Sequence, residues 1–98
     1  MINDIKEEVM LIAQEECAEV VQAISKCFRF GYNDEYNGLT NKQRLEEEVG
    51  DLMCMLELMQ QHGIIDSSKV LEANVRKRLK LKEWSNVFSK EKIGRAHV

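Results

Sequence analysis

Residues 3–30 read NDIKEEVMLIAQEECAEVVQAISKCFRF and contain neither glycine nor proline, the two residues that most often interrupt a helix. Once positions 16 and 19 are counted, apolar residues recur along this stretch every three or four positions, as shown by Ile5, Val9, Ile12, Val20 and Ala23. That period places them on one face of an α-helix. The stretch therefore predicts one long amphipathic helix, which we expect to end at Gly31.

A second long helix is predicted from Thr40 onward. Thr40 and Gln43 have the spacing of a capping box, in which the two side chains satisfy the free N–H groups of a helix start. The apolar stripe of this helix consists of Leu45, Leu52, Met55, Leu56 and Met59. Gly63 is its expected end. Residues 31–39 are rich in turn-forming residues and predict a loop between the two helices.

A third helix is expected to be capped by Asp66 or Ser67. Its apolar positions are Val70, Leu71, Val75 and Leu79. Residues 82–86 begin either a short fourth helix or an irregular tail. No stretch predicts a strand. The expected fold is all-α: two long antiparallel helices with one or two shorter ones.

The 98 residues, 44% hydrophobic and 32% charged, suffice for one domain, expected at residues 1–88 with a polar tail at 89–98. Such a short chain buries a thin core, so we expect a homo-oligomer that shares the core. Three cysteines without disulfide or zinc spacing, and the lack of a secretory signal, predict a cytoplasmic protein. No apolar run is long enough to span a membrane.

The charge is unevenly distributed along the chain. Residues 1–68 hold 14 acidic and 5 basic residues, whereas residues 69–98 hold 3 acidic and 9 basic ones. The net charge is −3, which argues against nonspecific binding of nucleic acid.

Acidic residues interrupt both apolar stripes in the same way. A helix advances about 100° per residue, so Glu16 lies in the middle of the first stripe and Glu19 on its flank. On the second helix Glu48 lies in the middle of the stripe, and Asp51 lies on its flank. Four carboxylates on two facing stripes would repel one another, and burying a carboxylate is costly unless it is paired or binds a metal. A divalent cation resolves this conflict, and an all-oxygen ligand set favours Mg²⁺ or Mn²⁺ over zinc.

Two other interpretations of these acids stay open, and a third, a di-iron site, is disfavoured. They can lie on a solvated face, as the run from Glu46 to Glu48 suggests, or pair with the basic third helix across a subunit interface. A di-iron site in a helix bundle needs Glu-x-x-His motifs, and neither His62 nor His97 follows a glutamate at that spacing.

The surrounding residues resemble a known family. Glu15-Glu16-Cys17-Ala18-Glu19 followed by Glu48-Val49-Gly50-Asp51 has the pattern E-E-x-x-E and then E-x-x-D. This pattern resembles the MazG-like all-α nucleoside triphosphate pyrophosphohydrolases, a superfamily that also includes phosphoribosyl-ATP pyrophosphohydrolase and the dimeric dUTPases. The sequence segments around Arg29-Phe30-Gly31 and Arg44-Leu45-Glu46 are similar to those of a small single-domain subgroup found in bacteria and phages. The resemblance covers roughly residues 8–85.

The resemblance implies hydrolysis of a (deoxy)nucleoside triphosphate between its α and β phosphates, giving a monophosphate and pyrophosphate. It implies Glu16, Glu19, Glu48 and Asp51 as Mg²⁺ ligands, with Mn²⁺ as a substitute. Glu15 matches the motif acid that orients or deprotonates the attacking water. The resemblance also implies a four-helix core that is completed by dimerisation, in a homodimer or a homotetramer.

The third helix carries the cations that the leaving pyrophosphate needs. By similarity to the family, Asn74, Arg76 and Lys80 are candidates for phosphate binding. Lys77 is added because it shares a helix face with Asn74 and Lys80. A solvated basic face is the alternative.

Two other functions stay open at the level of sequence. The first is hydrolysis of phosphoribosyl-ATP. The second is a noncatalytic helical dimer that binds metal or nucleotide as a regulatory or partner module, and turnover would distinguish it from an enzyme.

Overall fold

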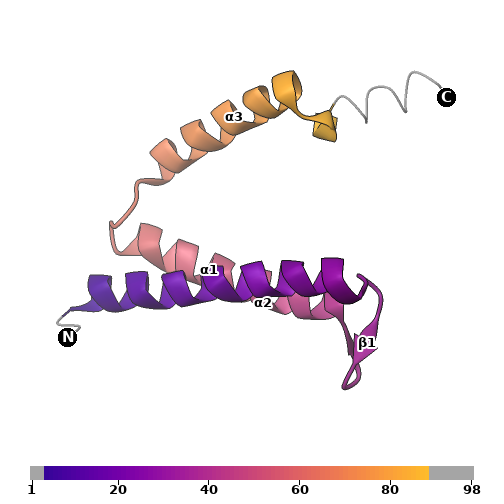
Figure 1. Ribbon diagram of the computed structural model, residues 1–98. Helices are drawn as coiled ribbons and strands as arrows, with labels where there is room; N and C mark the ends of the chain where they lie inside the picture. Colours follow the sequence, from indigo (N-terminus) through magenta and orange to yellow (C-terminus); the bar gives the residue numbers. More distant parts are fainter. Residues whose placement is uncertain (1–3, 89–98) are drawn as a thin grey trace. The chain divides into compact units, whose positions relative to one another are not determined.

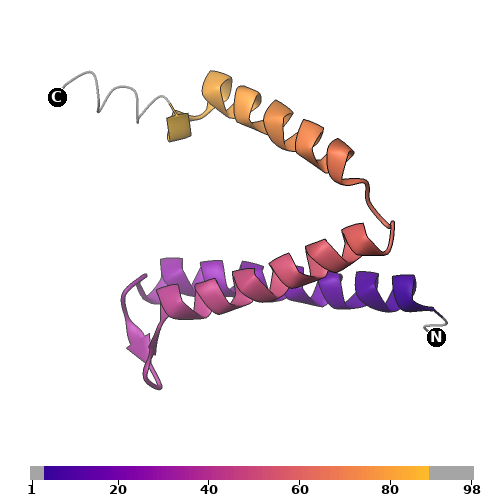
Figure 2. The same cartoon turned by 180° about the vertical axis from the view of Figure 1, so that it is seen from behind.

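The computed structural model describes residues 4–88, and its first 64 residues form a unit of two antiparallel helices. Helix α1 (Ile5–Phe30) and helix α2 (Asn41–Gln61) lie side by side in Figures 1 and 2. They are joined by a hairpin of two short strands, β1 (Glu35–Tyr36) and β2 (Leu39–Thr40). Helix α3 (Ser67–Trp84) belongs to a second unit and is described by itself. The predicted all-α fold, with two long antiparallel helices, is confirmed.

The helix ends follow the local signals in the sequence. Asp4 caps α1 by accepting a hydrogen bond from the backbone N–H of Glu7 at 2.9 Å. Gly31 follows the last residue of α1 at φ 105°, a backbone angle that glycine adopts without steric cost. At the start of α2, Thr40 and Gln43 form the complete capping box that the sequence predicts. Asp66, one of the two expected residues, caps α3 by accepting from the N–H of Ser68.

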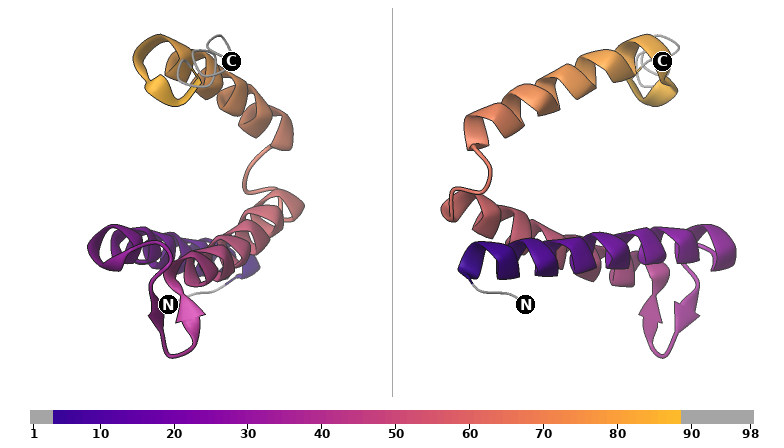
Figure 3. Two further views of the ribbon diagram at one scale, coloured as in Figure 1. Left: turned by 90° about the vertical axis from the view of Figure 1, so that its right-hand side faces the viewer. Right: turned by 60° about the vertical axis from the view of Figure 1, so that its left-hand side comes forward.

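The expectation that no stretch forms a strand is wrong for the connection between α1 and α2. Residues Glu35 and Tyr36 pair antiparallel with Thr40 and Leu39. The turn between them contains Asn37 at φ 53° and Gly38 at φ 84°. Two successive positive φ angles define the type I′ turn that Asn-Gly favours, and its twist matches that of a β-hairpin. Figure 3 shows the hairpin projecting from the end of the helix pair.

The hydrophobic core of this unit lies toward the end opposite the hairpin. Val9, Ala13 and Met55 are buried there, and four partly buried residues pack against them: Ile12, Leu58, Met59 and Ile64. Two helices alone bury few side chains completely, and in residues 4–88 none of the large ones is below 2% exposed. The helix pair is therefore held by a small core near one end, which leaves the remainder of the shared surface for other side chains.

Helix α3 has an apolar stripe but buries none of its own residues. Val70, Leu71, Val75 and Leu79 are between 41% and 64% exposed. The helix continues through Lys82 to Trp84, beyond the point where the sequence suggested a fresh start, and residues 86–88 form a further short helical turn. Among the helices of the described residues, none is long and apolar enough to cross a membrane. The polar tail expected at residues 89–98 lies outside the described residues.

Candidate metal centre

Three carboxylates from the two long helices converge between the core and the hairpin. Glu16 comes from α1, and Glu48 and Asp51 come from α2. One carboxylate oxygen from each residue lies within 4.8 Å of the other two. Glu16 and Glu48 are partly buried, whereas Asp51 is exposed. The cluster thus has two side chains at the helix–helix surface and a third at its rim.

The packing of the core positions these acids. Glu16 follows the buried Ala13 by three residues, so both side chains lie on the face that α1 presents to α2. Glu48 precedes the buried Met55 by seven residues, which is two helical turns on the face of α2 that meets α1. Because the helices are antiparallel, moving away from the core along either one leads to the carboxylates. The two acids meet as a consequence of the register that the core sets.

The electrostatics of the cluster are dominated by like charge. Burial raises the pKa of Glu48, and neighbouring negative charges raise it further. In order of size these come from Glu19, Asp51, Glu16 and Glu47. Among residues 4–88, none of the three clustered acids forms an ion pair with a basic side chain. The charge that would stabilise the ionised cluster must therefore come from elsewhere.

A hard divalent cation fits this arrangement. Carboxylate oxygens are the preferred protein ligands of Mg²⁺ and Mn²⁺, which are usually bound through a few carboxylates together with substrate phosphates. A cation among the three oxygens would remove the repulsion that raises the pKa of Glu48. The group contains no histidine or cysteine, which disfavours zinc.

The other two acids of the first motif lie outside the cluster of three. Glu19 is exposed, and its oxygens are not part of the 4.8 Å group, although its charge acts on Glu48 more strongly than any other neighbouring charge. Glu15 is exposed and adjacent to Glu16 in sequence, about 100° around the helix from it. The structure therefore brings together three of the four expected ligands and leaves Glu19 within electrostatic reach.

The four expected phosphate-binding residues all lie on α3 and divide into two pairs. Asn74 and Lys77 line a hollow of about 340 Å³ together with Arg78, Leu81 and Phe88. In this hollow Asn74 accepts a hydrogen bond from Arg78 Nε at 3.0 Å, and the Lys77 ammonium lies 5.0 Å from the Trp84 ring centroid. Arg76 and Lys80 are exposed and lie outside this hollow.

The relationship of the chain to known proteins is shown by a family model. The family model of the MazG nucleotide pyrophosphohydrolase domain matches residues 5–84. The chain belongs to the MazG nucleotide pyrophosphohydrolase family. The match begins at the first residue of α1 and ends at the last residue of α3, so it includes both MazG acid motifs and the basic helix. No curated protein and no solved structure matches the chain.

A second feature of this MazG domain is a pocket that was not predicted from the sequence. A pocket at the hairpin end is lined by seven residues: Lys26, Phe30, Asp34, Glu35, Tyr36, Asn41 and Arg44. They come from three separate segments, the end of α1, the hairpin and the start of α2. The Asn37-Gly38 turn was the available signal, because a hairpin at this point draws the three segments together.

Proposed function

We propose that the protein hydrolyses a (deoxy)nucleoside triphosphate at the bond between the α and β phosphates in a Mg²⁺-dependent reaction. The products would be a nucleoside monophosphate and pyrophosphate. The observation that carries the proposal is the convergence of Glu16, Glu48 and Asp51 within 4.8 Å in a chain of the MazG family. The alternative of a solvated acidic face does not account for two carboxylates that are partly buried between helices and that, among residues 4–88, lack a basic partner.

Each acid has a distinct task in this proposal. Mg²⁺, or Mn²⁺ as a substitute, is held by Glu16, Glu48 and Asp51. Glu19, on the next turn of α1, is the fourth metal ligand. The cation, when bound, supplies neutralisation of the triphosphate and activation of water. Glu15, which lies outside the ligand cluster, orients the attacking water or takes its proton. The support for this role is the position of Glu15 next to Glu16 in sequence but outside the cluster of three oxygens.

The cations of α3 serve the leaving group. Pyrophosphate leaves with more negative charge than it had as part of the triphosphate, and lysine and arginine side chains stabilise that charge. We assign this task to Asn74, Arg76, Lys77 and Lys80. The hollow that Asn74 and Lys77 share supports the assignment for those two residues. For Arg76 and Lys80 the support is their exposure and their match to the family pattern.

We further infer that the working form is a homodimer or a homotetramer. Val70, Leu71, Val75 and Leu79 give α3 an apolar stripe that the helix does not bury, and the core of the helix pair is small. A second copy of the chain that completes a four-helix core would cover such surfaces. The three free cysteines and a nucleotide substrate fit the cytoplasm as the compartment.

A panel of nucleotides tests the proposal. Pyrophosphate release is measured with all NTPs, all dNTPs and phosphoribosyl-ATP, each with Mg²⁺, with Mn²⁺ and with EDTA. We expect metal-dependent release that falls about a hundredfold or more in Glu16→Gln. Glu57→Gln, which lies on the opposite face of α2 from Glu48 by helical periodicity, is the matched control and should keep full activity.

The panel also distinguishes the other functions. Release from phosphoribosyl-ATP alone would favour the biosynthetic enzyme. A noncatalytic binding module would show a higher melting temperature with nucleotide and Mg²⁺ but no pyrophosphate from any compound.

A further inference from the structure

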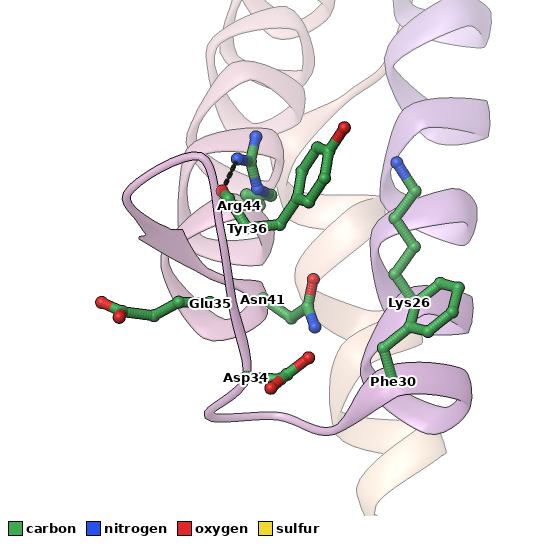
Figure 4. A pocket seen from close by; sticks show the side chains of 7 residues that line it. All are labelled: Lys26, Phe30, Asp34, Glu35, Tyr36, Asn41 and Arg44. Carbon is green, nitrogen blue, oxygen red and sulfur yellow. Dashed lines mark hydrogen bonds between the residues drawn. The ribbon is translucent and has the colours of Figure 1, made fainter.

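The pocket at the hairpin end, which we call the hairpin pocket, has a volume of about 390 Å³. This is within the range of about 300–1,000 Å³ that is usual for small-molecule sites. Figure 4 shows Lys26 and Phe30 of α1 on one side of it and Tyr36, Asn41 and Arg44 on the other. The helix pair opens here into a space with an aromatic ring on each side.

The hairpin pocket lies on the same helix faces as the carboxylates. Lys26 follows Glu19 by seven residues on α1, and Asn41 precedes Glu48 by seven residues on α2. Seven residues are close to two turns, so each pair of side chains shares a face about 10 Å apart along the axis. Because the helices are antiparallel, both steps lead toward the hairpin. A nucleotide with its phosphates at the carboxylates can therefore reach the hairpin pocket with its base.

The aromatic rings of the hairpin pocket are exposed, although the Arg29 guanidinium lies over Phe30, 4.9 Å from the ring centroid. Phe30 is 55% exposed and Tyr36 is 71% exposed, although both line the pocket. Arg44 donates a hydrogen bond to the backbone oxygen of Tyr36, and its guanidinium lies 5.8 Å from the Tyr36 ring centroid. These contacts hold the strand and its ring in place. Exposed, positioned rings are suited to stacking on a flat base.

The amide oxygen of Asn41 is a hydrogen-bond acceptor in the hairpin pocket, and the hydrogen bond from Asn41 to Gly31 determines which way this oxygen faces. Asn41 is 7% exposed, and its side-chain nitrogen donates to the backbone oxygen of Gly31 at 2.8 Å. A backbone carbonyl only accepts, so the amide nitrogen must face Gly31 and the amide oxygen must face the other way. In Figure 4 that oxygen points between Tyr36 and Lys26, into the pocket.

Asp34 and Arg44 add a charged acceptor and a charged donor. The Asp34 carboxylate forms no hydrogen bond or ion pair within residues 4–88, although its backbone bonds to Gly31 and Asn41. Arg44 Nε is buried and lacks a hydrogen-bond partner among the same residues. Because that atom is inaccessible, a ligand would meet the other N–H groups of the Arg44 guanidinium. The pocket therefore offers acceptors from Asp34 and Asn41 and donors from Arg44 and Lys26.

We propose that the hairpin pocket binds the nucleobase of the substrate and that its polar groups select guanine. Guanine has two adjacent N–H donor groups, at N1 and at the 2-amino group, and a carboxylate can accept from both. It also has two acceptors, O6 and N7, which arginine recognises. Adenine and cytosine each offer one amino group, and uracil and thymine offer one ring N–H. This inference rests on the proposed pyrophosphohydrolase function and names its substrate class.

The test compares GTP with ITP, which differs from GTP only by lacking the 2-amino group. In the wild type we expect kcat/KM for GTP to exceed that for ITP about tenfold or more, because a hydrogen bond to a charged carboxylate is lost. In Asp34→Ala the ratio should fall below about threefold. Asn33→Ala, a neighbouring polar residue outside the pocket, is the control and should keep the wild-type ratio. Equal use of GTP and ITP by the wild type, or an unchanged ratio in Asp34→Ala, would overturn the assignment.

A second pair of variants tests the stacking. Phe30→Leu should raise KM for GTP about tenfold, whereas Phe28→Leu, an 87% exposed ring outside the pocket, should not change it. Equal effects of the two substitutions would contradict a base in the hairpin pocket.

Failure of the proposed function is recognised separately. If no triphosphate releases pyrophosphate, that function is wrong, and calorimetric binding of GMP and IMP still tests the pocket. Binding of GMP about tenfold tighter than IMP would support the guanine site, and equal or absent binding would refute it.

Discussion

Replacing Glu48 by glutamine should stabilise the metal-free protein, because it removes the charge that Glu16 and Asp51 repel. The interacting oxygens lie within 4.8 Å, where two unit charges in water repel by about 0.9 kcal/mol. Salt at about 0.15 M, with a Debye length of about 8 Å, reduces this to about half. These two neighbours together then give about 1 kcal/mol, and the charge of Glu19 adds to the repulsion. For a chain of this size, that corresponds to a rise of roughly 4–8 °C in melting temperature.

The assay is thermal unfolding at pH 7 with EDTA and again with Mg²⁺. With EDTA, Glu48→Gln should melt above the wild type. With Mg²⁺, the wild type should gain stability and the variant should gain much less, because it has lost a ligand. Glu57→Gln removes a carboxylate from the opposite face of α2 and should leave both comparisons unchanged.

Two results would refute this reasoning. If Glu48→Gln melts below the wild type in EDTA, the carboxylates do not repel one another and a basic partner must neutralise them. If wild type and variant respond equally to Mg²⁺, the cation binds elsewhere.

The remaining predictions concern the pH dependence of stability, the glycine within α2 and the cap of α2. The pKa of Glu48 is raised in the folded state above its ordinary value of 4.5. The wild type should therefore lose stability relative to Glu48→Gln as pH rises through the folded-state pKa, and it should recover that stability below pH 4.5. Thermal unfolding in EDTA between about pH 4 and 7 measures the difference. Gly50→Ala should raise the free energy of unfolding by about 0.5–1 kcal/mol in urea denaturation, because Gly50 lies within α2 and an added Cβ meets no atom within 4 Å. A lower free energy of unfolding would indicate that Gly50 is in contact with a second copy in the assembled protein. Thr40→Ala should lower it by about 1 kcal/mol through loss of the capping box, whereas Thr40→Ser should be nearly neutral.

The sequence was sufficient to predict the helices and the meeting of the acids. The signals at the helix ends act through hydrogen bonds within a few residues, so their effect does not depend on distant parts of the chain. These signals are the Thr40–Gln43 pair, Gly31 and Asp66. The convergence of Glu16 with Glu48 follows from helical periodicity once two apolar stripes face each other. The exposed position of Glu19 was not predictable, because a wheel angle near the flank does not determine which acids approach closely.

The hairpin and its pocket were harder to foresee. Strands of two residues are too short to show the alternation that predicts a strand, and only Asn37-Gly38 gave a local signal. The pocket depends on Phe30, Tyr36 and Asn41, which come together through hydrogen bonds between the end of α1, the hairpin and the start of α2. Such contacts between segments have no periodic signature along the chain.

In the proposed reaction the carboxylate cluster holds the cation, and water attacks the α-phosphorus of a nucleoside triphosphate. Phosphorus NMR of the products formed in ¹⁸O-labelled water tests it most directly. With Mg²⁺ we expect labelled monophosphate and unlabelled pyrophosphate, and we expect no turnover with EDTA or in Glu48→Gln. Formation of a diphosphate and inorganic phosphate, or full activity in Glu48→Gln, would contradict it.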